Sequence, residues 1–133
     1  MITGNWTCDA FKKSLLDGTF KPDSLKLALY TKQATLNAQT EAYTTEGEVQ
    51  DIGYTAGGKP LEVEVRLDGS VAFLIIQNVQ WSARITARAG LIYQEGQGAV
   101  CVLDFGSDIK SSTKFVVEFP PPTKDSALIV IGS

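Results

Sequence analysis

The sequence predicts a mainly β protein, a two-sheet antiparallel sandwich or jelly roll with a short N-terminal helix. From Lys26 onward, apolar residues recur with a period of two in seven or eight short stretches. Glycine-containing turns such as Asp68-Gly69 separate most of these stretches, and helical periodicity is confined to one segment near the start. The 133 residues, 44% of them hydrophobic, are enough for one domain with its own core. We therefore expect a single domain over residues 1–133.

The segment with helical periodicity covers residues 5–17. Its apolar residues fall on one side of a 3.6-residue spiral, and they are Trp6, Cys8, Phe11, Leu15 and Leu16. Thr3 or Asn5 is suited to cap the start of this helix, and Gly18 is suited to end it in the left-handed conformation.

The period-two stretches indicate strands. They cover residues 25–30, 61–67, 71–76, 79–81, 85–93, 99–105, 114–118 and 127–131. In residues 61–67, apolar side chains alternate with Glu62, Glu64 and Arg66, which predicts one buried and one solvated face. Residues 71–76 and 99–105 are apolar on both faces, so we expect a cover on each side, either the helix or a neighbouring subunit.

Two segments fall outside this pattern. Residues 32–58 are a long polar connection, and a connection of this length is either functional or hides a short element; we favour a functional loop. Residues 120–133 form a Pro-rich C-terminal arm, in which Pro120 to Pro122 fix an extended segment ahead of the apolar residues 127–131. That last strand either pairs within its own sheet or is added to the sheet of a neighbour, and both alternatives remain open.

One stretch, GYTAGGKP, nearly matches the phosphate-binding pattern G-x-x-x-x-G-K-[ST], with Gly53, Gly58 and Lys59 in place. The residue after Lys59 is Pro60, which has no hydroxyl for Mg²⁺ and disfavours the helix that the motif needs. A period-two strand follows instead, so we reject nucleotide binding.

Catalytic and metal-binding chemistry also finds little support. The chain has no histidine and two cysteines, which excludes a Ser-His-Asp site and a structural zinc site, and we expect neither a metal nor a cofactor. Glu62 and Glu64 share a strand face about 7 Å apart, a separation that inverting glycosidases use. Arg66 continues the same row, which is typical of ordinary surface charge. We predict that the protein is not an enzyme.

Composition also limits the partners. The net charge of −3 argues against nucleic acid, and no apolar segment approaches the roughly 18 residues of a membrane span. The start of the chain lacks the apolar region of a secretory signal, so we expect synthesis in a reducing cytoplasm.

Five residues are candidates for a partner interface. Tyr43 and Tyr54 lie in the polar loop with no obvious core to fill, and Lys59 follows in the same region. Arg84 and Arg88 share one face at even spacing, which suits either an interface stripe or an ordinary solvated stripe.

Several stretches in order, AFKKSLLDG, LKLALYTKQATLNAQTEAYTTEGEV, GYTAGGKPL, ITARAGLIY and VLDFG, resemble a family of small structural proteins of tailed bacteriophages. The closest assignment is a capsid decoration, or cement, protein. The resemblance implies a small sandwich or jelly roll that sits on the outer capsid surface and bridges major capsid subunits without catalysis. It also implies a virion protein that is made in the host cytoplasm and binds the major capsid protein, with copies of itself as further partners in a dimer or trimer.

An alternative function from another class is a tail- or fibre-associated module that binds a host glycan. Such a module would stack aromatic side chains on sugar rings and offer carboxylates to hydroxyls. Tyr43, Tyr54 and the face that carries Glu62 and Glu64 would serve these roles.

Overall fold

A computed structural model describes residues 2–123 and 126–131 of the chain. In chain order its elements are β1 (Gly4–Thr7), α1 (Asp9–Asp17), the 3-10 helix η1 (Pro22–Ser24), β2 (Leu25–Tyr30), β3 (Lys59–Pro60), β4 (Val63–Asp68), β5 (Val71–Ile76), β6 (Val79–Trp81), β7 (Thr86–Gln94), β8 (Gly98–Lys110), β9 (Phe115–Val117) and β10 (Val130–Ile131). The predicted fold class is confirmed, because the protein is mainly β with antiparallel sheets and one helix near the N-terminus.

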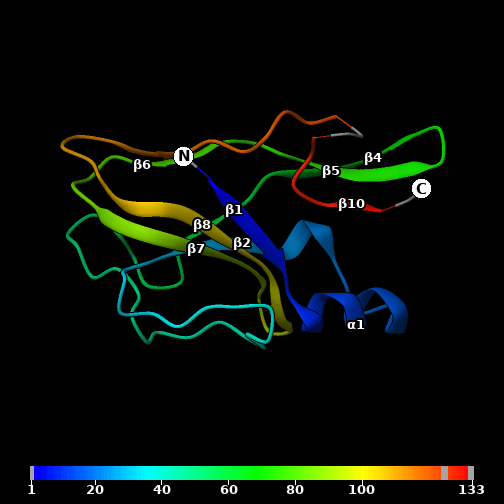
Figure 1. Ribbon diagram of the computed structural model, residues 1–133, viewed down its shortest axis with the longest axis horizontal. Coiled ribbons are helices and arrows are strands. Elements are labelled where there is room, and N and C mark those ends of the chain that lie inside the picture. The colour runs from blue at the N-terminus through cyan, green and yellow to red at the C-terminus, as the bar shows by residue number, and fades with distance from the viewer. Residues whose placement is uncertain (1, 124–125, 132–133) are drawn as a thin grey trace.

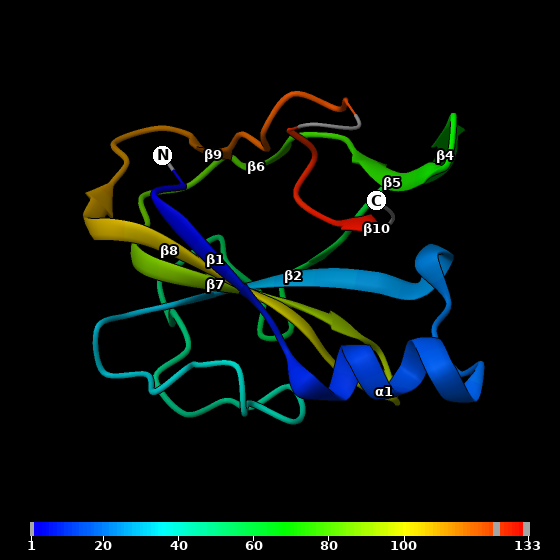
Figure 2. The same ribbon diagram turned by 45° about the vertical axis from the view of Figure 1, so that its right-hand side comes forward.

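The central sheet has five strands in the order β1-β8-β7-β2-β3, and every pair is antiparallel. On one side of it lie a three-stranded sheet, β10-β5-β4, and the two-stranded pair β6-β9. On the other side lies much of the long connection of residues 32–58, with α1 beside it at the end of the sheet (Figures 1 and 2). Val49 and Tyr54 of this connection pack with Trp81 of β6. The central sheet is therefore covered on both faces, as strands with two apolar faces require.

Two hydrophobic clusters fill the spaces on either side of the central sheet. The larger contains Leu27 and Phe105 of this sheet and Trp81 of the smaller pair. The second contains Tyr30 and Val102 and is completed by residues of the long connection, Ala34, Leu36 and Tyr43. The sequence predicted the helix or a neighbouring subunit as the cover for the two-faced strand at residues 99–105. On this face the polar loop brings apolar side chains to the sheet instead.

Most strands lie where the period-two pattern places them, but the predicted helix is too long. Residues 4–7 form β1, paired with Cys101 to Asp104 of β8, and α1 begins at Asp9. The N-cap is Cys8, which makes no side-chain capping bond, so the expected caps are wrong. Gly18 ends the helix at φ 80°, as predicted. As a consequence Trp6 lies on the sheet, 47% exposed, rather than on a buried helix face.

The two edge strands of the smaller sheet are β10 and β4, and β4 is less buried than the sequence predicts. β10 pairs with β5, so the apolar residues Val130 and Ile131 join their own sheet. Residues 124–125 and 132–133 of the predicted arm lie outside the described residues. In β4, however, Val65 is 56% exposed and Leu67 is 70% exposed. The predicted buried face of this strand is covered only near Val63, which packs against the main cluster.

Candidate functional site

A buried carboxylate organises the long loop. Glu48 is 6% exposed and accepts hydrogen bonds from the hydroxyls of Tyr43 and Tyr54, both at 2.5 Å, and from the backbone N–H of Gly57 at 2.8 Å. The backbone N–H of Leu29, in β2, donates to the Tyr54 hydroxyl at 3.0 Å. A charge so deeply buried is tolerated because three donors replace its water.

The tyrosines of this network are held in their neutral form. Burial, followed by the hydrogen bond to Glu48, raises the pKa of Tyr54 and of Tyr43 far above the ordinary tyrosine range. Burial also raises the pKa of Tyr93 to about 12, and its hydroxyl donates to the carbonyl of Gly57 at 2.6 Å. These hydroxyls therefore act as fixed donors that join the loop to the central sheet.

The expectation that Tyr43 and Tyr54 are displayed to a partner is corrected. Tyr54 is 9% exposed, and its ring lies 5.9 Å from the ring of Trp81. Tyr43 is half-buried and stacks on Tyr93 with ring centroids 4.9 Å apart. Both have a core to fill, which the sequence conceals because its other members come from distant strands.

The same loop displays Ile52 instead. Ile52 is 96% exposed and sits in a turn closed by the bond from the Tyr54 N–H to the Asp51 carbonyl at 3.1 Å. Gly53 follows with φ 95°, as the third position of a type II turn requires. The nearest sequence signal for this residue is a lone isoleucine before glycine in a polar stretch, which is too weak to indicate a site.

The turn at residues 51–54 is anchored against the segment that enters β7. The Asp51 carboxylate accepts a bond from the Thr86 N–H at 3.0 Å. A Cβ placed on Gly53 would lie 2.6 Å from the Cβ of Ala83, so the backbone is in close contact there. With Tyr54 buried behind it, Ile52 is presented by a fixed backbone rather than by a free loop tip.

Two of the predicted cations are also exposed. Arg84 follows Ala83, the residue that Gly53 of the turn approaches closely. Lys59 donates to the carbonyl of Gln80 and lies 5.6 Å from the ring of Trp81, which in turn lies 5.9 Å from the ring of Tyr54. We call the exposed side chains Ile52, Lys59 and Arg84 the Ile52 surface. It contains an apolar side chain and an arginine, and arginine is enriched in protein contacts.

Arg88 lies further along the same segment as Arg84. It pairs with Asp108 at 3.9 Å and lines a hollow of about 200 Å³ together with Trp6 and Asp104. Arg84 precedes β7, and the register of β7 with β8 is irregular between Ala87 and Ala89. Both arginines are exposed and alternate with the buried Ile85 and Ala87, which agrees with the predicted shared face. Their role in binding stays a prediction.

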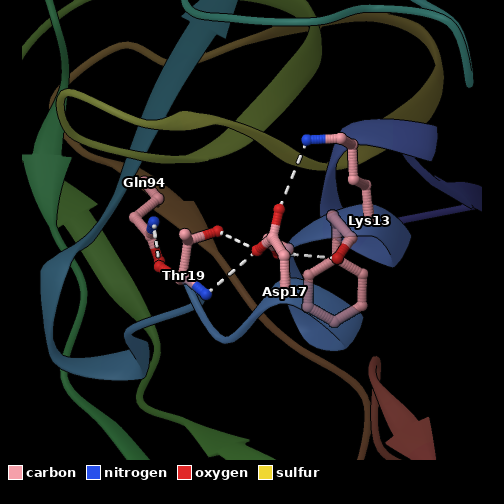
Figure 3. Close-up of polar contacts among 6 residues, drawn as sticks. Lys13, Asp17, Thr19 and Gln94 are labelled. Carbon is pink, nitrogen blue, oxygen red and sulfur yellow. Dashed lines mark hydrogen bonds and ion pairs between the residues drawn. The ribbon is translucent and has the colours of Figure 1, made fainter.

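A second hollow, of about 270 Å³, lies between α1 and the end of β7. Figure 3 shows the polar contacts of Lys13, Asp17, Thr19 and Gln94, which line it. Asp17 accepts bonds from the Thr19 hydroxyl at 2.6 Å and from Lys13 at 3.3 Å, and the Thr19 bond lowers the pKa of Asp17. Gln94 donates to the carbonyl of Thr19 at 2.9 Å. These polar groups bind one another, and they connect the helix to the sheet rather than forming an acid–base pair.

The motif and metal candidates have plain structural roles. Lys59-Pro60 forms β3 against β2, so the Gly-rich stretch leads into a strand rather than a helix.

Among residues 2–123 and 126–131, no group of three or more carboxylate or thiol side chains is placed to hold a metal ion. In the same residues, no helix has the length and apolar character needed to cross a membrane. Cys8 and Cys101 are both buried free thiols.

Comparisons with protein-family models, curated proteins and solved structures gave no match.

Proposed function

We propose that the protein is a non-enzymatic structural protein of a tailed-phage virion. In this proposal it binds the outer surface of the assembled capsid and stabilises the shell by bridging major capsid subunits. The resemblance of its sequence to small phage structural proteins supports the choice of partner. The arrangement of the long loop supports a protein contact.

The observation that carries the proposal is the display of Ile52. A fully solvated isoleucine is unfavourable in isolation, and here the backbone around it is held by Asp51, Gly53 and Tyr54. Burying such a side chain in a partner's pocket contributes about 1.5–3 kcal/mol, and a preformed turn adds little ordering cost. Arg84 is exposed and follows Ala83, which Gly53 of the turn approaches closely, so it would supply a fork of donors for a carboxylate on the partner.

Stabilisation would follow from mass action. A protein that binds the assembled shell, but not the free capsid subunits, lowers the free energy of the assembled state. Many copies on one shell add their contributions, so each contact is modest while the particle gains substantial resistance to disruption.

The experiment mixes the purified protein with undecorated capsids of the phage and measures co-sedimentation and the temperature of shell disruption. The variant Ile52→Ser should bind about 10–100-fold more weakly. The matched control is Leu16→Ser, which removes a side chain that is 93% exposed on α1 and lies away from the turn. If Ile52→Ser binds as tightly as the wild type and Leu16→Ser, the Ile52 surface does not contact the capsid. If the wild type does not bind capsids at all, the proposal is overturned.

A second candidate, a tail- or fibre-associated glycan-binding module, rests on one observation. Trp6 is half-exposed beside Arg88 and Asp104 in the 200 Å³ hollow, where a sugar ring could stack and its hydroxyls bond. This replaces the tyrosines on which the sequence-based alternative relied. Saturable glycan binding that Trp6→Ala abolishes, without capsid binding, would favour this module.

A further inference from the structure

β4 has an unprotected edge. It is the outermost strand of the sheet β10-β5-β4 and spans six residues, whereas the edge strands β3 and β10 span two each. The 3-10 helix η1 lies near β4, yet residues 64–68 are all exposed. Within the described part of the chain no strand pairs with this edge. Long exposed edges template the addition of another strand, and natural proteins usually shorten or block them.

The hydrogen-bonding groups at this edge follow from the pairing with β5. Gln77 donates to the carbonyl of Glu62, so the even-numbered residues of β4 bond to β5. The backbone groups of Val63, Val65 and Leu67 therefore point to the open edge. Their side chains lie on the face that continues the core, where Val65 and Leu67 are largely exposed.

The sequence of β4 is complementary to itself when reversed. In an antiparallel pair of two copies centred on Val65, Val63 faces Leu67 and Glu64 faces Arg66 of the second copy. All three outward-pointing residues then fall in hydrogen-bonded pairs, about six bonds in total, and the charged residues fall in the closer non-bonded pairs. The next pair outward would be Glu62 with Asp68, two carboxylates, which limits the match to this stretch.

From this complementarity we infer that two copies of the protein associate through their β4 edges into one continuous sheet. Within one copy Arg66 pairs with Glu64 at 3.1 Å, with both side chains more than half exposed. In the dimer, Glu64 and Arg66 of one copy also lie opposite Arg66 and Glu64 of the other copy. Val63, Val65 and Leu67 of the two copies then lie side by side on one face of the joined sheet, which covers part of Val65 and Leu67. The inference does not depend on the capsid proposal.

The other in-phase registers are less favourable. Sliding the second strand by two residues one way places Glu64 opposite Glu64, although Arg66 then faces Glu62, and sliding it the other way places Arg66 opposite Arg66. Either slide also leaves one of the three outward-pointing residues, Val63 or Leu67, without a partner among the other two, whereas the register centred on Val65 pairs all three. Charge and the number of backbone bonds together therefore favour an identical strand in the register centred on Val65.

Charge reversal tests the inference. In Glu64→Arg both side chains are cationic, and in Arg66→Glu both are anionic, so each variant alone should dimerise at least about tenfold more weakly. An equimolar mixture of the two should form a heterodimer. The double variant Glu64→Arg with Arg66→Glu is again self-complementary and should recover the wild-type dimer.

Sedimentation equilibrium gives the dissociation constants, native mass spectrometry identifies the heterodimer, and circular dichroism confirms folding of each variant. Hydrogen exchange on the wild type needs no variant: protection at the amides of Val63, Val65 and Leu67 should rise with protein concentration. The inference is overturned if the wild type stays monomeric up to about 1 mM. It is also overturned if the dimer is insensitive to the reversals, or if those amides exchange at a concentration-independent rate. Capsid binding by a monomeric wild type would leave the proposed function standing while ending this inference.

Discussion

The long loop of residues 32–58 and the hairpin of β4 and β5 differ in how regular backbone structure relates to the burial of side chains. The loop has no helix or strand of its own, yet it places Glu48, Val49 and Tyr54 in the interior. The hairpin is a regular antiparallel ladder, yet its first strand leaves Val65 and Leu67 in solvent. Regular backbone hydrogen bonding and burial are thus separate properties in this protein. The loop is fixed by a few specific polar atoms, and the hairpin is left open for another strand.

The largest change should come from removing the centre of the loop network. Glu48→Ala leaves the hydroxyls of Tyr43 and Tyr54 and the N–H of Gly57 without their acceptor, so we expect a loss of about 4 kcal/mol in the free energy of unfolding. Urea unfolding measures it. Glu48→Gln keeps an acceptor oxygen and should lose less; equal losses in both variants would mean that the charge, not the bonding, matters.

A smaller loss should follow from crowding the end of the loop. Gly58 has φ 76°, and a Cβ there would lie 1.8 Å from the carbonyl oxygen of Leu27. Gly58→Ala should therefore cost about 3 kcal/mol through backbone displacement and strain. Gly96 has φ 80° with nothing near its Cβ, so Gly96→Ala isolates the strain alone at about 1 kcal/mol. Similar unfolding midpoints for the two variants would contradict the close packing at Gly58.

The loop should also make the protein sensitive to alkali. Folding raises the pKa of Tyr93 from 10.0 to about 12 through burial, so its contribution is complete below pH 10 and disappears as the pH rises toward 12. Burial raises the pKa of Cys8 from 9.0 to about 11 in the same direction. Urea midpoints should fall progressively above pH 9, and Tyr93→Phe should make that decline shallower. A midpoint that is constant up to pH 12 would refute the buried network.

The smallest effect is expected on the hairpin. Leu67→Ser should change the free energy of unfolding by less than about 0.5 kcal/mol at concentrations where the chain is monomeric, because the side chain is already in water. Leu74→Ala, on the buried strand β5, should cost about 3 kcal/mol. Guanidinium unfolding of both variants at low protein concentration compares them. A large loss for Leu67→Ser would mean that something covers this strand.

The strands were predictable because their signal is local. The stretches at residues 25–30, 71–76 and 79–81 agree with β2, β5 and β6 to the residue, since alternation and adjacent turns decide them. β1 was misread because Trp6 and Cys8 also fit a helical spiral. Its strand conformation depends on β8, which lies far along the chain.

The candidate site was less predictable for the same reason. Tyr54 has polar neighbours in sequence, and its burial depends on Glu48, Leu29 and Trp81 meeting in space. Lys59, Arg84 and Arg88 are all exposed, and for the two arginines the alternation with buried neighbours is a local signal that the sequence carries. Their role in binding stays a prediction.

The pairing of β1 with β8 also bears on how the chain reaches its fold during synthesis. Gly4 lies opposite Asp104, so the first strand made has its partner among the last third of the residues. At about 5–20 residues per second, the ribosome takes several seconds to deliver that partner. During this interval the central sheet lacks β8. The pairing of β1 with β8 therefore forms late and joins residues that are far apart in the sequence. A chain that ends before β8 would therefore lack the partner of β1 in the central sheet.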